Sequence, residues 1–318
     1  MTTLVIGAGL VGSQVARVLA GQGEKPVLMD TSAQTQAIGQ IVPLEDVTMI
    51  SGDILRPLSV VKAINDHEIS GIIHTAANPM LTLGAQTDPY SAINLNIMGT
   101  VNVLEAARVT GVRRVVVSSS NVLNHYLAGG NGQTEPMNEE AYPRPTTFYS
   151  ATKQAIESLG LNYSKWCGVE FAGMRYGAVF GPWSGAGGGG PSNVIRTAMR
   201  NLMNGDEATI PAGTMEWVYS KDAGRGTVLA LRANDLGTGI FNVTMKQATP
   251  PDELAAALRA IFPEGKIRIE TPKGTAVSLP NMRRTSDGSI SKATIGYEPE
   301  FDIRSALADM HAWMKVNG

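Results

Sequence analysis

The length, composition and charge of the chain are typical of a globular protein and exclude several other classes. Its 318 residues are 43% hydrophobic and 17% charged, which fits about two domains, or one large α/β domain with a lobe, rather than a disordered or fibrous chain. Lys and Arg number 26 against 28 for Asp and Glu, and the formal net charge is -2. We expect no nucleic-acid partner, because binding to a phosphate backbone needs an excess of positive charge.

The cysteine and histidine content gives no sign of a metal. Cys167 is the single cysteine, so an intramolecular disulfide and a cysteine-cluster metal site are excluded, and a reducing compartment is favoured. The four histidines are scattered along the chain: His67, His74, His125 and His311. The apolar run Leu4–Ile6 is too short for a signal peptide or a spanning helix. We therefore expect no metal, no membrane partner and a cytoplasmic location.

Short apolar runs alternate with helical patterns through the first half of the chain. The runs predicted to be strands are Leu4–Ile6, Val27–Met29, Val47–Ile50, Gly71–His74 and Val115–Val117. Their unbroken apolarity indicates burial on both faces, as in a parallel sheet. Helices are expected over Val11–Ala20, from Asp88 and Pro89 onward with Asp88 as the N-cap, and over Phe148–Leu161. The alternation predicts an α/β fold with a doubly wound parallel sheet of the Rossmann type.

A glycine turn lies between the first predicted strand and helix. The residues Gly7, Gly9 and Gly12, with Leu10 and Val11 between the last two, form a GxGxxG pattern. In this position the first glycine permits a tight turn, the second lets a pyrophosphate approach the backbone, and the third lets helix and sheet pack. The N-terminus of the helix attracts the anion. The alternative is an ordinary glycine turn without a ligand.

Asp30 ends the second predicted strand and decides which dinucleotide is expected. Its carboxylate can accept hydrogen bonds from both hydroxyls of an adenosine ribose and would repel a 2′-phosphate. Residues 31–34 contain no Lys or Arg that would bind such a phosphate. The sequence therefore predicts NAD rather than NADP as the cofactor, and the alternative is a capping aspartate of a plain turn.

Further cofactor contacts are expected where the later strands end. They are Asp53 and Ile54 after the third strand, His74, Ala76 and Ala77 at the end of the fourth, and Ser118 at the end of the fifth. The carboxyl ends of parallel strands form the edge where a dinucleotide binds. Taken alone, His74 is better explained as a structural histidine.

Tyr149 and Lys153 are spaced i and i+4 and so share one face of a predicted helix. A free tyrosine has a pKa of about 10. We expect Lys153 and a positive nicotinamide ring to lower the pKa of Tyr149 by ~3 units, so that the phenol acts as general base or acid on a substrate hydroxyl. Ser120 is expected to bind the substrate oxygen as charge develops on it, and Lys153 to hold the nicotinamide ribose as well.

The composition changes after Arg175, where Gly-Pro pairs and shorter mixed elements begin. We predict an NAD-binding Rossmann-type domain over residues 1–175 and mainly a substrate-binding lobe over residues 176–318, with some segments returning to the Rossmann core. The glycine-rich tract from Ser184 to Pro191 is either a flexible connector or a mobile lid. The sequence leaves both open.

The order of glycine turn, strand-end Asp, strand-end serines and YxxxK resembles the extended short-chain dehydrogenase/reductases, the NAD-dependent epimerase/dehydratase family. Nearly the whole chain takes part in the resemblance. The other similar segments are Asn96–Thr100 (NVxGT in the family), Arg175 and Tyr176 with Phe180–Pro182 (RYxxVYGP), Phe241–Val243 (YNV) and Ile295–Pro299 (LGWEP). The resemblance implies that Asn96 and Tyr176 lie at the cofactor. It also implies a homodimer formed through a four-helix bundle that includes the YxxxK helix.

Departures from the family pattern bear on the substrate. Ala178 stands where nucleotide-sugar members usually carry an Asn, and Met215 stands where they commonly carry an Arg that binds the diphosphate. A diphosphate without cationic partners loses its strongest hydrogen bonds, so a nucleotide sugar is less favoured. The candidate substrate contacts are Ser120, Tyr149, Trp183, Trp217, Lys221, Arg283 and Arg284, although both tryptophans suit a core equally well.

Three functions stay open at this point. The leading hypothesis is an NAD-dependent oxidoreductase that transfers hydride between the nicotinamide and a secondary alcohol or ketone of a small polar substrate, such as a sugar acid, an amino alcohol or a hydroxy acid. The alternative is a sugar or nucleotide-sugar epimerase or dehydratase that retains its NAD and returns the hydride. The third is an NAD-sensing protein without catalysis.

Overall fold

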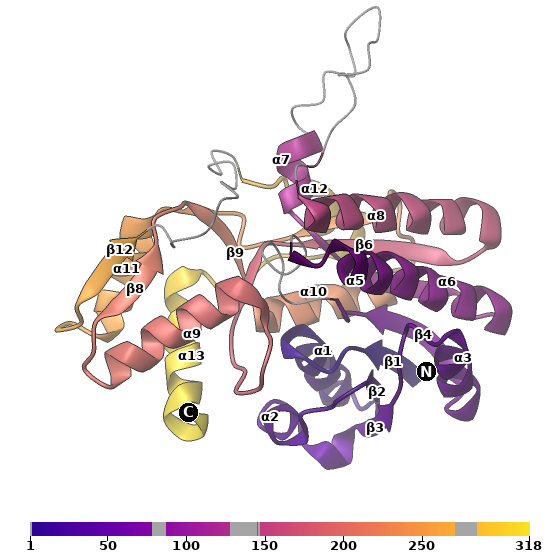
Figure 1. The fold of residues 1–318 in the computed structure, drawn as a ribbon, viewed down its shortest axis with the longest axis horizontal. Coiled ribbons are helices and arrows are strands. Elements are labelled where there is room, and N and C mark those ends of the chain that lie inside the picture. Colours follow the sequence, from indigo (N-terminus) through magenta and orange to yellow (C-terminus); the bar gives the residue numbers. More distant parts are fainter. Residues whose placement is uncertain (1, 78–86, 128–144, 146, 271–284) are drawn as a thin grey trace, which may run out of the picture.

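The strands expected from the sequence form one central sheet (Figure 1). Its members are β1 (Thr2–Ile6), β2 (Val27–Asp30), β3 (Thr48–Ser51), β4 (Ile69–His74), β5 (Arg114–Ser120), β6 (Glu170–Tyr176) and β10 (Ile240–Val243). Their order is β10-β6-β5-β4-β1-β2-β3, and all neighbours are parallel. This is the doubly wound sheet that was predicted, with its topological switch point between β1 and β4. This computed structural model describes residues 2–77, 87–127, 145, 147–270 and 285–318.

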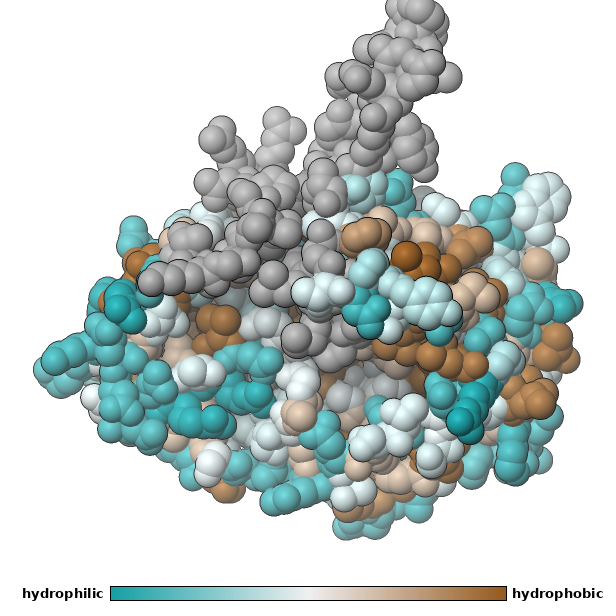
Figure 2. Space-filling view, viewed as in Figure 1, coloured by the Kyte–Doolittle hydropathy of each residue, from teal (hydrophilic) through white to brown (hydrophobic). Residues whose placement is uncertain are grey.

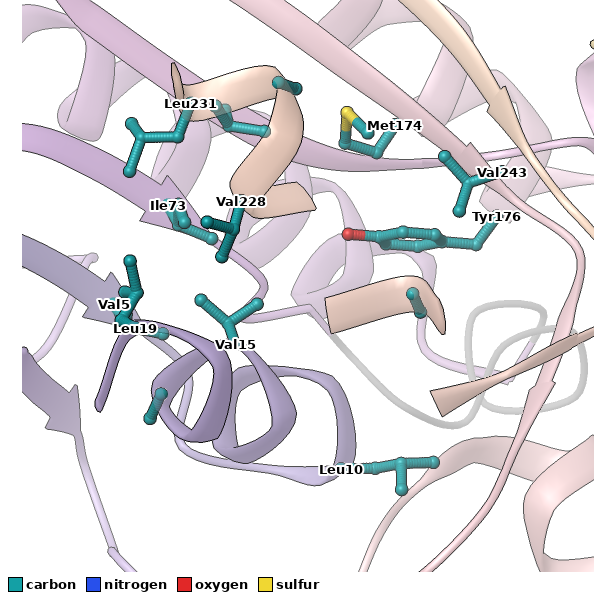
Figure 3. Close-up of a cluster of buried hydrophobic side chains, with 14 of the residues drawn as sticks. Val5, Leu10, Val15, Leu19, Ile73, Met174, Tyr176, Val228, Leu231 and Val243 are labelled. Atoms are coloured by element: carbon teal, nitrogen blue, oxygen red, sulfur yellow. The ribbon is translucent and has the colours of Figure 1, made fainter. Parts of the chain in front are cut away.

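Helices cover both faces of the sheet, which explains the unbroken apolar runs. One face carries α1 (Leu10–Gly21) and α10 (Ser220–Arg232), and the other carries α3 (Pro57–Asp66), α6 (Gly99–Thr110) and α8 (Phe148–Cys167). Val5 belongs to the first core cluster, whereas Leu4 and Ile6 belong to the second. Successive strand side chains point to opposite faces. Figure 3 shows the first cluster, in which Val5 and Val15 lie near Val228.

The helix expected from Asp88 onward consists of three consecutive pieces. These are α5 (Pro89–Ile93), a π-helical turn η2 (Asn94–Met98) and α6. The Asp88 carboxylate accepts a hydrogen bond from the Ser91 amide at 3.0 Å, as an N-cap should. The π-helical turn was not predicted. Such turns are frequent at functional sites, and this one carries Asn96.

The YxxxK helix begins where the sequence placed it and runs past the expected end at Leu161 to Cys167. Thr147 caps it by accepting a hydrogen bond from the Ser150 amide at 3.1 Å. The helix ends at Gly168, whose φ of +73° is left-handed and suits glycine. Its apolar stripe packs on the second core cluster through Ile156.

The second half of the chain builds a third hydrophobic cluster beside the sheet. It uses a three-stranded sheet of β7 (Ala178–Phe180), β9 (Met215–Tyr219) and β11 (Ala248–Thr249), and a two-stranded sheet of β8 (Ala208–Pro211) and β12 (Ile267–Glu270). The helices packed there are α9 (Gly189–Met203), α11 (Pro251–Ile261) and α13 (Ile303–Asn317). Three elements of this half lie elsewhere, because β10 pairs with β6, α10 packs on α1, and α12 (Ser289–Ile295) contacts α10 and β10.

Four short helices complete the described elements: α2 (Thr35–Gly39), η1 (Leu44–Asp46), α7 (Val122–Leu127) and α12 (Ser289–Ile295). Within the described residues, no helix combines the length and apolar character that crossing a membrane requires.

Candidate active site

The glycine turn has the geometry that the sequence motif requires. Gly7 has a φ of +93°, and a Cβ on it would lie 2.6 Å from the Ala76 amide nitrogen. A Cβ on Gly12 would lie 1.8 Å from the Gly7 carbonyl oxygen, so only glycine lets α1 sit this close to the turn. A Cβ on Gly9 would meet no atom within 4 Å. The open space before the N-terminus of α1, where Leu10 and Val11 begin the helix, therefore fits a pyrophosphate.

Asp30 links the turn to the next loop. Its Oδ2 accepts a hydrogen bond from the Ala8 amide at 2.9 Å, and its Oδ1 accepts one from the Ser32 amide at 3.0 Å. The carboxylate is half-buried at the end of β2. It is therefore held in place beside the glycine turn, where an adenosine ribose would meet it.

The other expected cofactor residues lie after the neighbouring strands. Asp53 follows β3 and its carboxylate accepts a hydrogen bond from the Leu55 amide at 2.8 Å, whereas Ile54 is buried and its carbonyl accepts one from Asn102 at 2.8 Å. Ala76 and Ala77 follow β4 and are half-buried. These residues lie at the carboxyl edge of the sheet, on both sides of the switch point.

His74 is a buried histidine in a neutral state. Burial, followed by the positive charge of Lys153, lowers the pKa of His74 to about 3. Its Nε2 lies 3.2 Å from the Thr100 hydroxyl, and among the described residues its Nδ1 has no partner. This environment gives His74 a structural role.

Ser120, Tyr149 and Lys153 come together from two elements. Ser120 ends β5, and its side chain lies close enough to the Tyr149 phenol, near the start of α8, to act on the pKa of that phenol. The Lys153 Nζ lies 5.6 Å from the centre of the Tyr149 ring and donates a hydrogen bond to the Ser118 carbonyl at 2.8 Å. A hydroxyl, a phenol and an ammonium thus share one site, which is the arrangement that acid–base transfer at a substrate oxygen needs.

The protein's own groups raise the pKa of Tyr149 rather than lower it. Burial raises it to about 12, against a smaller opposite effect of the Ser120 side chain. Burial also lowers the pKa of Lys153 to about 8, and the nearby Glu157 carboxylate opposes this shift. Lys153 therefore does not by itself produce the lowering of the Tyr149 pKa that we expected, and the expectation then rests on the positive charge that a bound nicotinamide would add.

Asn96 lies in the π-helical turn and is 2% exposed. Its Nδ2 donates a hydrogen bond to the Thr152 hydroxyl at 3.2 Å, which ties the turn to the helix of Tyr149 and Lys153. Its carbonyl accepts a hydrogen bond from the Thr100 hydroxyl at 2.7 Å. The turn therefore supports α8 from one side.

Glu157 is a residue of α8 that holds this helix on the sheet. The sequence analysis missed it. Its carboxylate forms a bidentate pair with Arg175, with distances of 2.9 and 2.7 Å, and accepts a hydrogen bond from Ser119. Glu157 follows Lys153 by one further helical turn, so extending the i, i+4 series along α8 would have found it. The pair fixes α8 against β5 and β6.

A second buried carboxylate, Glu216, joins the strand of Ser120 to the second half of the chain. Glu216 is 1% exposed and accepts hydrogen bonds from Asn121 at 3.1 Å, from Thr244 at 2.8 Å and from the hydroxyl of Ser286 at 2.6 Å. Asn124 donates to the Ser286 hydroxyl at 2.9 Å and accepts from Arg175 at 2.8 Å. No local sequence signal announces this network, because its partners are far apart along the chain.

Several expected ligand contacts take other positions in the structure. Trp183 is 0% and Trp217 1% exposed, each inside a hydrophobic cluster. The Tyr176 hydroxyl pairs with Thr227 in the first core cluster. We therefore assign these three side chains to packing and leave them out of the site.

The expected cationic contacts divide into one that is paired and two that the structure does not describe. Lys221 forms an ion pair with Asp309 at 2.7 Å. Arg283 and Arg284 lie outside the described residues. In the part of the chain that is described, no three His, Cys, Asp or Glu side chains gather as metal ligands would.

Comparison with known proteins places the chain in a family. Residues 3–244 match the NAD dependent epimerase/dehydratase family. The chain is 24% identical to UDP-glucuronate 4-epimerase 5 of Arabidopsis thaliana over 342 residues, which cover 98% of this chain and 75% of that protein.

Two solved structures have the same fold. UDP-glucose 4-epimerase from Thermotoga maritima, solved with UDP-glucose, has a TM-score of 0.80 at 22% identity and covers 99% of both chains. A partial consensus L-threonine 3-dehydrogenase has a TM-score of 0.81 at 23% identity and covers 99% of this chain and 100% of its own. The glycine turn, the strand-end aspartate and the matched family together show that this chain belongs to the NAD-dependent epimerase/dehydratase family of extended short-chain dehydrogenase/reductases.

Proposed function

We propose that this enzyme oxidises a secondary alcohol of a small polar substrate, or reduces the matching ketone, with NAD as the hydride carrier. The observation that carries the proposal is the convergence of Ser120, Tyr149 and Lys153 at the carboxyl end of β5. When bound, NAD accepts the hydride that leaves the substrate carbon.

The protein's residues handle the proton. Tyr149 takes the proton of the substrate hydroxyl during oxidation and returns it during reduction. Ser120, whose side chain lies near the Tyr149 phenol, donates to the substrate oxygen as negative charge develops there. The Lys153 ammonium favours the ionised phenol through its charge. Gly9, Asp30, Asp53, Ile54 and the residues after β4 hold the cofactor.

The cations around the site favour a small substrate over one that carries a diphosphate. Arg175 is paired with Glu157, and Lys221 is paired with Asp309. Met215 gives strand β9 an apolar side chain where an arginine would bind phosphate. We propose a sugar acid, amino alcohol or hydroxy acid, with Arg283 and Arg284 as candidates for binding its anionic group.

A second candidate is an epimerase or dehydratase that keeps its NAD and returns the hydride to the substrate. The comparisons favour it, since the relative that the chain matches over 98% of its length is named a UDP-glucuronate 4-epimerase. Both candidates use the same site and differ in the fate of the hydride. A protein that only senses NAD would have no use for the hydroxyl, phenol and ammonium that meet here.

A spectrophotometric screen separates these functions. Purified protein and NAD are mixed with secondary alcohols, sugar acids and UDP-glucose, and the absorbance of NADH is followed together with product analysis. A dehydrogenase accumulates NADH, an epimerase converts substrate without net reduction, and a sensor binds NAD without converting any substrate.

In either enzyme, Tyr149→Phe should lower turnover about 10²–10⁴-fold while NADH still binds. Tyr90→Phe, on an exposed tyrosine of α5, is the control. Turnover by Tyr149→Phe within a few-fold of the wild-type value would show that the assignment is wrong.

We further propose that the enzyme is a homodimer through α6 and α8. Met98, the last residue of η2 before α6, is 47% exposed and Val109 on α6 is 58% exposed. On α8, Phe148, Leu159 and Trp166 are 42%, 37% and 72% exposed. The residues on each helix are spaced by seven or eleven positions and so share a face. Figure 2 shows brown, hydrophobic residues gathered over this region. Such a patch is typical of an interface.

A further inference from the structure

The glycine-rich tract, which the sequence left as connector or lid, is fastened to the loop that follows Asp30. The Oε1 of Gln34 accepts a hydrogen bond from the Ala186 amide at 2.5 Å, and its Nε2 donates to the Ala186 carbonyl at 3.2 Å. One side-chain amide therefore satisfies both backbone groups of a residue 152 positions away. In Figure 1 the loop that leads into α9 reaches α2.

A second contact lies beside the first. The Ser184 hydroxyl donates a hydrogen bond to the Gln40 side chain, and the Gln40 carbonyl accepts one from the Trp313 indole at 3.2 Å. The segment Ser184–Gly188 is thus bound at both ends of α2. We call the contacts of Gln34 with Ala186 and of Gln40 with Ser184 the clasp.

The tract is held in shape from its own side as well. The Trp183 indole donates to the Ala186 carbonyl at 3.1 Å, and Arg196 donates to the carbonyls of Trp183 and Gly185 at 3.0 Å each. A Cβ on Gly185 would lie 2.6 Å from both the Gln34 Oε1 and the Trp183 ring. A glycine here lets the tract and the loop of Gln34 approach each other closely. These contacts are inconsistent with a flexible connector.

The clasp lies where the adenosine end of NAD would bind. Gln34 follows Asp30 in the same loop, and the Asp30 carboxylate accepts the Ser32 and Ala8 amides. On the other side, Trp183 shares a buried cluster with Ala8 and Leu10 of the glycine turn. The tract is therefore bound to the two ends of α2, and the neighbouring Trp183 belongs to the same buried cluster as the turn.

We propose that the clasp is a gate for cofactor exchange, which opens to admit or release NAD and is otherwise closed. The inference rests on the proposed NAD-dependent function and adds to it a step that limits how fast the cofactor leaves. Because the clasp is made by the protein alone, breaking it raises the open fraction of the free and the bound protein alike. The association and dissociation rates then rise together, and the affinity stays nearly the same.

The test measures NADH binding and release by stopped-flow fluorescence on protein freed of copurified cofactor. In Gln34→Ala both rate constants are expected to rise about tenfold, because two hydrogen bonds to Ala186 are lost, while Kd stays within about threefold of wild type. Ser184→Ala, which removes the other contact, should raise both rates less. Gln36→Ala is the matched control, because Gln36 is an exposed glutamine of α2, the helix that directly follows Gln34. Thermal unfolding verifies that all three variants are folded.

Two results overturn the gate. One is exchange rates in Gln34→Ala within twofold of the wild type. The other is a faster release matched by an equally weaker affinity, which marks Gln34 as a direct cofactor contact. A wild-type protein that fails to bind NADH contradicts the proposed function instead, so the two failures can be told apart.

Discussion

At the scale of single residues, environment decides chemistry that the residue type leaves open. Tyr149 and Lys153 are a predicted pair, and the structure brings them together with Ser120. Their titration could not be read from spacing, because burial is the largest influence on both pKa values. Spacing fixes which side chains share a helical face, whereas desolvation depends on what the rest of the chain places over them.

Lys153 should leave a pH signature in stability. Its pKa falls on folding from the usual 10.5 to about 8, so between these values the folded protein binds fewer protons than the unfolded chain, and its stability rises with pH. At pH 7 the free energy of unfolding of Lys153→Met should therefore exceed that of the wild type, by on the order of 3 kcal/mol from the titration alone. This gain should shrink steadily from pH 8 to 10.5. Urea unfolding at several pH values measures it, and the hydrogen bond lost to Ser118 adds only a constant offset. A difference that does not change with pH contradicts the shift.

Asp30 should control the choice between the two dinucleotides. Asp30→Asn keeps an acceptor for the Ala8 or Ser32 amide but removes the charge that repels a 2′-phosphate. We expect the preference for NADH over NADPH, measured as a ratio of dissociation constants by fluorescence titration, to fall about tenfold or more. Asp46→Asn, on an exposed residue of η1, serves as the control. An unchanged ratio would remove Asp30 from the ribose site.

At the scale of elements, local sequence patterns predicted strands and helices, whereas contacts between distant segments could not be predicted. The apolar runs predicted the first five strands, and the cap at Thr147 marks the start of α8 at Phe148. The π-helical turn at Asn94–Met98 interrupts a helix that we predicted to be continuous. No residue in this segment indicates that the helix widens there. The clasp and the Glu216 network join segments that lie far apart in sequence, and such pairs leave no periodic signal.

The exposed face of α6 and α8 should control assembly. If it is the dimer interface, Leu159→Asp places a charge in the middle of it and should shift the protein to a monomer of 33.6 kDa. Light scattering after gel filtration measures the mass. Val316→Asp is the matched control, because Val316 is 82% exposed on α13, a helix that packs on the third hydrophobic cluster and not on α6 or α8. A monomeric wild type, or a dimeric Leu159→Asp, would rule the interface out.

At the scale of the whole molecule, buried polar networks hold the two halves of the chain together. Glu216 on β9 receives hydrogen bonds from Asn121 after β5, from Thr244 after β10 and from Ser286. A buried charge of this kind is stabilised only while its donors stay in place. The end of β5, where Ser120 lies, therefore depends on residues contributed much later in the sequence.

Removing the charge of Glu216 should destabilise the fold as a whole. Glu216→Gln keeps the shape of the side chain but places an amide NH2, itself a donor, against donors that the carboxylate accepted. The free energy of unfolding should fall by about 2–4 kcal/mol. Calorimetry and chemical denaturation measure the loss. Glu264→Gln, an exposed position between α11 and β12, should change stability by less than about 0.5 kcal/mol. Equal stability of the two variants would show that the network contributes little.

The place of β10 has a consequence for how the protein can be divided. This strand comes from the second half of the chain, yet it lies at the end of the sheet and pairs with β6 along Gly173–Tyr176. A fragment that stops near residue 175 would leave the β6 backbone amides and carbonyls that face β10 without partners, while those that face β5 stay paired. Exposed strand edges recruit other chains. Cutting the gene at the compositional boundary should therefore yield aggregates, and the intact protein should melt in one cooperative transition.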